Sequence, residues 1–184
     1  LRRRRRLRRM VTETAMAGTI ARWWAHLRHG ASSARRAFPD AALARIEQAI
    51  ERSEQEHTAE LRFAIEASLP IDDVRRGRTP RERALEVFAN TGVWDTEANN
   101  GVLLYVLLAD HAVEIVADRA AAARIDAGYW REICTSLSDA YRRGDFEAGT
   151  MSAIERIGRL LAAAFPRGAG TTDVDELPNR PLVL

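Results

Sequence analysis

The 184-residue chain contains no lysine, and all 28 of its basic residues are arginine. Mechanisms that need a lysine amine, either as a Schiff base or as the phosphate contact of a P-loop, are therefore excluded. Cys134 is the only cysteine, so no disulfide forms within the chain and the sequence requires no oxidising compartment. No apolar run approaches the ~18 residues that are needed to cross a bilayer.

Excess positive charge is absent outside the N-terminal segment. Residues 1–36 hold 11 arginines and one acid, whereas residues 37–184 hold 17 arginines and 25 acids. A surface that binds nucleic acid carries an excess of positive charge, so we expect no nucleic acid partner for the acidic part. A hydrophobic content of 46% with 29% charged residues is typical of a globular protein.

A complete export signal is also missing. The opening LRRRRRLRR is similar to the basic start of such a signal, but the following stretch, MVTETAMAGTIA, is interrupted by Glu13 and three threonines. We therefore expect a cytoplasmic protein that is not secreted.

An amphipathic helix is predicted over residues 19–28, because Ile20, Trp23, Trp24 and Leu27 recur at helical spacing. Adjacent tryptophans beside arginines are typical of a membrane interface, so residues 19–36 are expected to contact a membrane surface or a membrane protein, peripherally at the inner membrane. The alternative is that this helix folds back over an open edge of the domain and pairs its arginines with acids there. His26 and His29 are interpreted as solvated, and GASSARR (residues 30–36) as a linker.

The pattern of the remaining chain alternates helices and strands. Strands are predicted within residues 59–68, at 102–108 and at 112–118, with a tight turn at 109–111 joining the last two. Helices are predicted over residues 38–56, 79–90, 127–142 and 146–165, and Thr79, Pro80 and Glu82 form a capping box at the start of the second. Residues 69–78 are expected to be a loop, and the tail after Pro166 to be extended.

This order predicts an α/β fold, a three-layer α/β/α sandwich with a small mixed sheet. The strand–helix–strand unit over residues 59–108 makes a right-handed parallel crossover, and the tight turn at 109–111 makes an antiparallel hairpin. Residues 102–108 are apolar on both faces, which indicates the central strand. We expect a basic N-terminal segment (1–36), an α/β/α domain (37–166) and a C-terminal tail (167–184).

Familiar catalytic motifs are absent. The chain has no G-x-S-x-G, H-E-x-x-H, P-loop, G-x-G-x-x-G or C-x-x-C. RHG at residues 28–30 begins like a histidine phosphatase motif, but Ser32 stands where that motif needs an arginine. The catalytic residues are therefore unknown, and no small-molecule cofactor is predicted. Cys134 follows Trp130 and Ile133 on one helix face, so it is predicted to be a core residue.

Oxygen-bearing side chains gather before the central strand, in WDTEANNG. An EF-hand is excluded, because its sixth and twelfth positions hold Asn100 and Val106. The predicted hairpin nevertheless brings Asn99 and Asn100 near Asp118. The candidate ligands for a weakly bound Ca²⁺ or Mg²⁺ are Asp95, Asn99, Asn100 and Asp118. The alternative is turn chemistry, with the amides in positive-φ positions and Asp118 capping the next helix.

The order of these pieces resembles the TPM-domain family, and most closely its short stand-alone bacterial members. The resemblance covers about residues 37–181 and is carried by the series W-x₅-NGVLLYVLLAD-x₂-VEIVAD, then YRRGDFEAG, then DELPNRP. It matches Asn100-Gly101 to the Asn-Gly that opens a family strand, and Gly144 and Gly149 to a helix break. Arg35 and Arg36 stand where longer relatives carry an aspartate.

The resemblance implies an α/β/α fold, calcium binding and a link to phosphatase activity, photosystem repair or the modulation of membrane receptors. Two classes of function follow. The first is a non-catalytic interaction domain that acts at a membrane surface or on a membrane protein complex and has a weak divalent-cation site. The second is a metal-assisted acid phosphatase that hydrolyses phosphomonoesters. We favour the first, because no nucleophile or arginine cluster for phosphate is evident in the sequence.

Overall fold

The computed structural model describes residues 20–168 and 176–184; the arginine run at residues 2–9 and Thr19 lie outside them. Residues 20–28 are helical. The elements that follow are α2 (Ala31–Ala37), α3 (Asp40–Glu54), β1 (Leu61–Glu66), α4 (Ile71–Arg75), α5 (Pro80–Asn90), β2 (Val102–Leu107), β3 (Ala112–Ala117), α6 (Arg119–Arg124), α7 (Ala127–Arg142), α8 (Phe146–Ala164) and β4 (Leu182–Val183).

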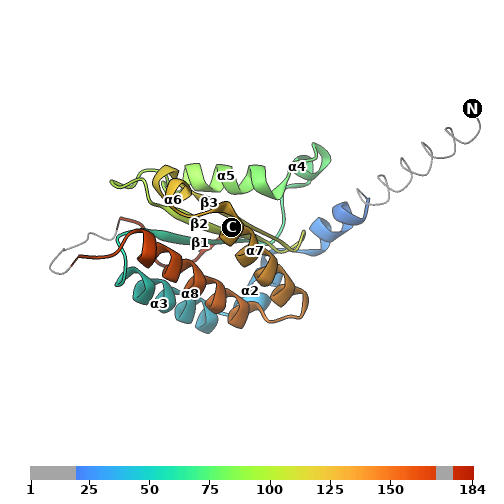
Figure 1. Ribbon diagram of the computed structural model, residues 1–184. Helices are drawn as coiled ribbons and strands as arrows, with labels where there is room; N and C mark the ends of the chain where they lie inside the picture. Colours follow the sequence, from blue (N-terminus) through green and yellow to red (C-terminus); the bar gives the residue numbers. More distant parts are fainter. Residues whose placement is uncertain (1–19, 169–175) are drawn as a thin grey trace, which may run out of the picture.

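The sheet lies between two layers of helices, so the predicted mixed α/β/α sandwich is confirmed (Figure 1). Its strand order is β3-β2-β1-β4. β1 pairs with β2 in parallel, and β2 pairs with β3 antiparallel, as the crossover and the hairpin require. α5 covers one face of the sheet, and α3, α7 and α8 cover the other.

β2 is the central strand in the sense that each of its side chains is buried. Val102, Leu104 and Val106 join the core beneath α3, α7 and α8. Leu103, Tyr105 and Leu107 join the smaller core beneath α5. The period of two residues therefore distributes one short sequence between both layers of the sandwich.

The capping signal at the start of α5 forms as predicted. The Thr79 side chain accepts a hydrogen bond from the Glu82 N–H, and the Glu82 carboxylate accepts one from the Thr79 N–H. Pro80 occupies the first helical position, where its missing N–H costs no hydrogen bond. This fixed start orients the crossover helix between the parallel strands.

Two predictions about irregular segments were wrong, and a third was incomplete. The expected linker at residues 30–36 forms α2, because Ala34 and Phe38 are buried and tertiary packing stabilises a short helix. The expected loop at residues 69–78 contains α4, which follows Pro70. The tail is extended but is also paired, since Leu182 and Val183 form β4 in parallel with β1.

Cys134 packs against the larger core but is only partly buried. Burial raises the pKa of its thiol to about 11, and the negative charge of Glu114 adds to that effect. The thiolate is the reactive form, so both protonation and limited access protect the native thiol from reagents.

We expect a thiol reagent to label native Cys134 slowly at pH 8, where only about one thiol in a thousand is ionised if its pKa is about 11. The rate should rise about tenfold per pH unit up to pH 10, because the thiolate fraction rises by that factor. The unfolded chain in guanidinium is the control. Equal labelling rates for the native and unfolded chains at pH 8 would show that the thiol is not shielded.

Candidate functional site

The start of β2 and the end of β3 meet at one rim of the sheet. The register pairs Val102 with Ala117, and the Asp118 N–H donates to the Gly101 carbonyl over 2.9 Å. The Ala120 N–H donates to the Asn99 carbonyl, also over 2.9 Å. The hairpin therefore brings Asn99, Asn100 and Asp118 together, as the sequence predicts.

Asn100 is fully buried beneath this rim. Its N–H donates to the Thr96 hydroxyl over 3.1 Å, and its side-chain amide donates to the Thr58 carbonyl over 2.7 Å. These bonds hold the loop of residues 91–101 against the turn that precedes β1. The Oδ1 atom of Asn100 accepts no hydrogen bond from the part of the chain that the structure describes.

Asp118 caps α6. One of its carboxylate oxygens accepts a hydrogen bond from the Arg119 N–H over 2.7 Å. The other, Oδ2, is buried and has no hydrogen-bond partner among residues 20–168 and 176–184. A buried acceptor without a partner is costly, so Asp118 and Asn100 each leave an oxygen that a cation would satisfy.

The four candidate ligands differ in their surroundings. The Arg119 guanidinium donates to the Asn99 side-chain oxygen over 2.8 Å, which occupies that oxygen and brings a positive charge to the rim. Asp95 is exposed. No group of three or more His, Cys, Asp or Glu side chains within the described ranges could hold a metal ion. Of the four candidates, Asn100 and Asp118 each keep one buried oxygen without a hydrogen-bond partner among the described residues.

Gly101 is fixed at this rim by a close approach of two backbones. A Cβ at Gly101 would lie 2.0 Å from the Val93 carbonyl oxygen. The Asn-Gly pair therefore has a steric cause: the loop passes so close to the start of β2 that a side chain cannot be accommodated. The C-terminal tail also reaches this loop, since the Glu176 carboxylate accepts the Glu97 N–H over 3.0 Å.

A second polar cluster lies at the other end of the hairpin, where Asp110 follows β2. The Arg22 guanidinium donates to both Asp110 oxygens, with the Nε–Oδ1 and Nη2–Oδ2 distances at 2.9 and 2.8 Å. His26 Nε2 lies 3.0 Å from Asp110 Oδ1, and its Nδ1 accepts the Leu69 N–H over 3.0 Å. The interpretation of His26 as solvated was wrong, because the ring is buried between these partners.

Asp110 attaches the N-terminal helix to the domain through Arg22 and His26. Burial would raise the pKa of this carboxyl, but the hydrogen bonds and charge of Arg22, with a smaller contribution from His26, lower it below its ordinary value. A lowered pKa in the folded state stabilises the docked helix at neutral pH, and this contribution is lost as the pH falls through that pKa. Arg22 and His26 are four residues apart, so they share one helix face.

The opposite face of residues 20–28 points to solvent. The four side chains of the predicted apolar stripe are exposed: Ile20 by 53%, Trp23 by 36%, Trp24 by 54% and Leu27 by 50%. Figure 1 shows this helix projecting from one end of the sandwich. The helix is thus attached by its polar face and presents its apolar face, the reverse of an ordinary surface helix.

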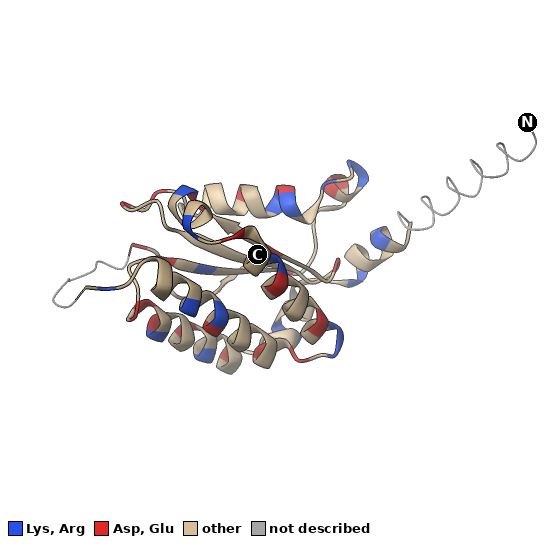
Figure 2. Cartoon of the chain, viewed as in Figure 1, with Lys and Arg blue, Asp and Glu red and all other residues tan. Residues whose placement is uncertain are grey.

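Charge elsewhere is mixed, since acidic and basic residues are interspersed along the helices in Figure 2.

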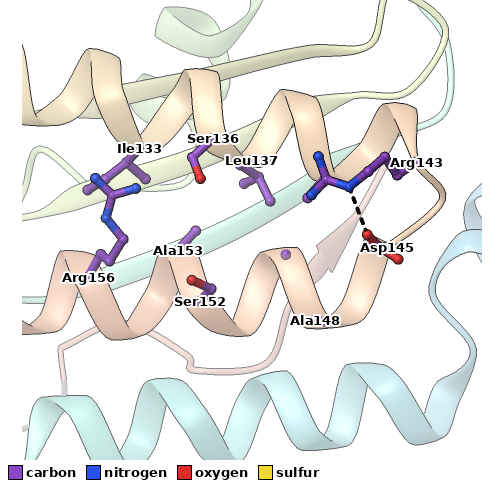
Figure 3. A pocket seen from close by; sticks show the side chains of 11 residues that line it. Ile133, Ser136, Leu137, Arg143, Asp145, Ala148, Ser152, Ala153 and Arg156 are labelled. Carbon is purple, nitrogen blue, oxygen red and sulfur yellow. Dashed lines mark hydrogen bonds and ion pairs between the residues drawn. The ribbon is translucent and has the colours of Figure 1, made fainter.

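A cavity of about 230 Å³ lies between α7 and α8 (Figure 3). Its charged residues are paired, Arg143 with Asp145 and Arg156 with Glu132. Gly149 contributes to its wall, and a Cβ there would lie 2.7 Å from the Ala140 Cβ. We assign this cavity to helix packing.

Comparison with known proteins gives a consistent picture. A family model described as the TPM domain matches residues 34–160. A solved structure, the NMR structure of BA42 protein from the psychrophilic bacterium Bizionia argentinensis, is similar with a TM-score of 0.69 and 27% identity. The match covers 79% of this chain and 94% of that one. A comparison with the curated proteins found no match. No helix in the described ranges is long and apolar enough to cross a membrane.

We expect Gly101→Ala to lower the free energy of unfolding by about 2–4 kcal/mol, because the new methyl group must displace the Val93 carbonyl. Gly30→Ala is the matched control, since a Cβ there meets no atom within 4 Å and its φ of −122° suits any residue. Urea denaturation measures both. Similar stabilities for the two variants would contradict the close approach at Gly101.

Proposed function

The chain belongs to the TPM-domain family, and we propose that it is a non-catalytic interaction domain that associates peripherally with an anionic membrane surface. The observation that carries this proposal is the reversed helix at residues 20–28, which is held by Arg22 and His26 and presents Trp24 and its apolar neighbours outward. The alternative partner of the same helix is a membrane protein at that surface.

The chemistry of the apolar stripe suits a bilayer interface. Its two tryptophans have amphipathic rings that favour the headgroup region, and Ile20 and Leu27 reach into the acyl boundary beside them. Burying one large apolar side chain contributes about 1.5–3 kcal/mol, so the stripe supplies moderate and reversible binding. The docked polar face needs no rearrangement for the stripe to make this contact.

Positive charge continues beyond the stripe. Arg28, Arg35 and Arg36 are exposed on residues 20–36. Basic residues near an anionic surface contribute about 1 kcal/mol each, and salt screens them over roughly 10 Å. We infer that the association weakens as salt increases, whereas the contribution of the apolar stripe remains.

The rim at the opposite end of the hairpin is proposed to bind Ca²⁺ or Mg²⁺ weakly. Asp118 and Asn100 would supply the two unpaired oxygens, water would complete the shell, and Asp95 and Asn99 would contribute only by moving. A metal-assisted phosphatase is the alternative function. We favour the non-catalytic role because Asn100, Asp118 and their hydrogen-bond partners include no activated nucleophile, and the adjacent Arg119 is bound to Asn99.

Trp24→Ser should reduce the binding of the full chain to phosphatidylserine-containing vesicles by about tenfold in co-sedimentation at low salt. Trp94→Ser is the matched control, since Trp94 is 53% exposed but lies in the loop before β2. Its binding should match that of the unmodified chain. Equal losses in both variants, or no sedimentation of the unmodified chain, would refute the membrane role of residues 20–28.

Titration calorimetry with Ca²⁺ should give a dissociation constant weaker than about 10⁻⁴ M, because two protein oxygens dehydrate the ion poorly. Asp118→Asn should abolish this binding and keep α6 intact, since asparagine is an equally good N-cap. The same variant tests the alternative function, because a metal-assisted phosphatase should lose its activity on a generic phosphomonoester in Asp118→Asn. A nanomolar affinity for Ca²⁺, or unchanged binding by Asp118→Asn, would show that the ligands lie elsewhere.

A further inference from the structure

A cavity of about 250 Å³ lies where α2, the β2–β3 turn and the start of α8 meet. Its apolar wall is formed by Ala37, Leu108 and Phe146. Its polar lining consists of four hydrogen-bonding side chains: His29, Ser33, Arg36 and His111. It is separate from the rim at Asn100 and Asp118, since it lies near the opposite end of β2.

The polar lining is cationic or neutral, and it contains no carboxylate. Arg36 makes a long contact of 3.5 Å with the Ser33 hydroxyl, and no ion pair to it is found among residues 20–168 and 176–184. The acids nearest to the lining in sequence are Asp110, beside His111, and Asp145 and Glu147, on either side of Phe146. Each is paired with another basic side chain: Asp110 with Arg22 and His26, Asp145 with Arg143, and Glu147 with Arg45. The cavity therefore presents a guanidinium and hydrogen-bonding groups without a compensating anion.

The two imidazoles of the lining, His29 and His111, lie close to each other. Their ring centroids lie 6.4 Å apart in an edge-to-face arrangement. His29 Nδ1 lies 2.9 Å from the Ala25 carbonyl, which can only accept, so Nδ1 carries the proton and Nε2 remains available. His111 has a φ of 49°, a left-handed conformation that costs energy for a residue with a side chain and is often found at functional sites.

We propose that this cavity binds a phosphate group. The Arg36 fork matches two phosphate oxygens, the Ser33 hydroxyl donates to a third, and the imidazole nitrogens hydrogen-bond to the anion. A divalent metal ion is disfavoured, because the lining contains no carboxylate and Arg36 repels a cation. The proposal is independent of the membrane role, since the phosphate could belong to a soluble ester or to a lipid headgroup.

In the first experiment, the full chain is titrated with inorganic phosphate while the imidazole signals are monitored by NMR. Phosphate should shift the signals of His29 and His111 and leave the buried His26 and His57 unchanged. Arg36→Gln should weaken binding at least tenfold, whereas the matched control Arg35→Gln, which removes the same charge from α2 outside the cavity, should change it less than twofold. Equal effects of the two variants, or shifts in none of the imidazoles, would overturn the proposal.

Vesicles distinguish the two sources of phosphate. Phosphatidic acid exposes a phosphomonoester, so a preference for it over phosphatidylserine at equal surface charge, lost in Arg36→Gln but not in Arg35→Gln, assigns the cavity to a lipid headgroup. Binding of inorganic phosphate without such a preference assigns it to a soluble phosphate ester. Trp24→Ser should leave phosphate binding in solution unchanged, so failure of the membrane role and failure of this cavity are separately visible.

Discussion

Burial of β2 on both faces is the constraint that arranges the rest of the molecule. Val102 to Leu107 face one core or the other, and the one polar side chain among them, Tyr105, donates its hydroxyl to Glu66. The other polar groups near this strand lie at its two ends. At its start, Asn100 and Gly101 are held by the loop before the strand and meet Asp118. At its end, Asp110 anchors the N-terminal helix. The rim at Asn100 and Asp118 and the anchor of the N-terminal helix thus lie at the two ends of one strand, with hydrophobic core between them.

The outer edges of the sheet are closed by side chains and by the tail. At the β3 edge, the Arg81 guanidinium donates to the Ile115 carbonyl over 2.6 Å, which occupies a group that would otherwise pair with another strand. At the β1 edge, β4 pairs with the strand, and the Arg62 guanidinium donates to the Pro178 and Arg180 carbonyls. Arginine suits these positions because its planar fork reaches several acceptors at once.

Periodicity predicted the parts of the fold that depend on local pattern. The central strand, the capping box at Thr79 and the meeting of Asn100 with Asp118 follow from the hydrophobic period, turn chemistry and hairpin geometry. What it missed depends on distant partners. His26 is buried because Asp110, 84 residues away, accepts its hydrogen bond, and β4 has only two residues, too few for a strand signal. The capture of Asn99 by Arg119 is equally invisible in the sequence. One sequence signal for the docking of the N-terminal helix was present: Arg22 and His26 are four residues apart and therefore share a polar helix face, opposite Trp23 and Trp24.

The polar attachment of the N-terminal helix explains why its apolar stripe remains available. An amphipathic helix that docks on its own domain normally buries its apolar face, because that burial supplies most of its stability. Here Asp110 supplies a partly buried acceptor for Arg22 and His26, and Arg22 also donates to the Arg78 carbonyl over 2.6 Å. Charge-assisted hydrogen bonds hold the polar face of the helix, so its apolar face is not buried within the molecule. The free energy of burying Trp24 and its neighbours is then left for an external surface, which is what a reversible membrane contact requires.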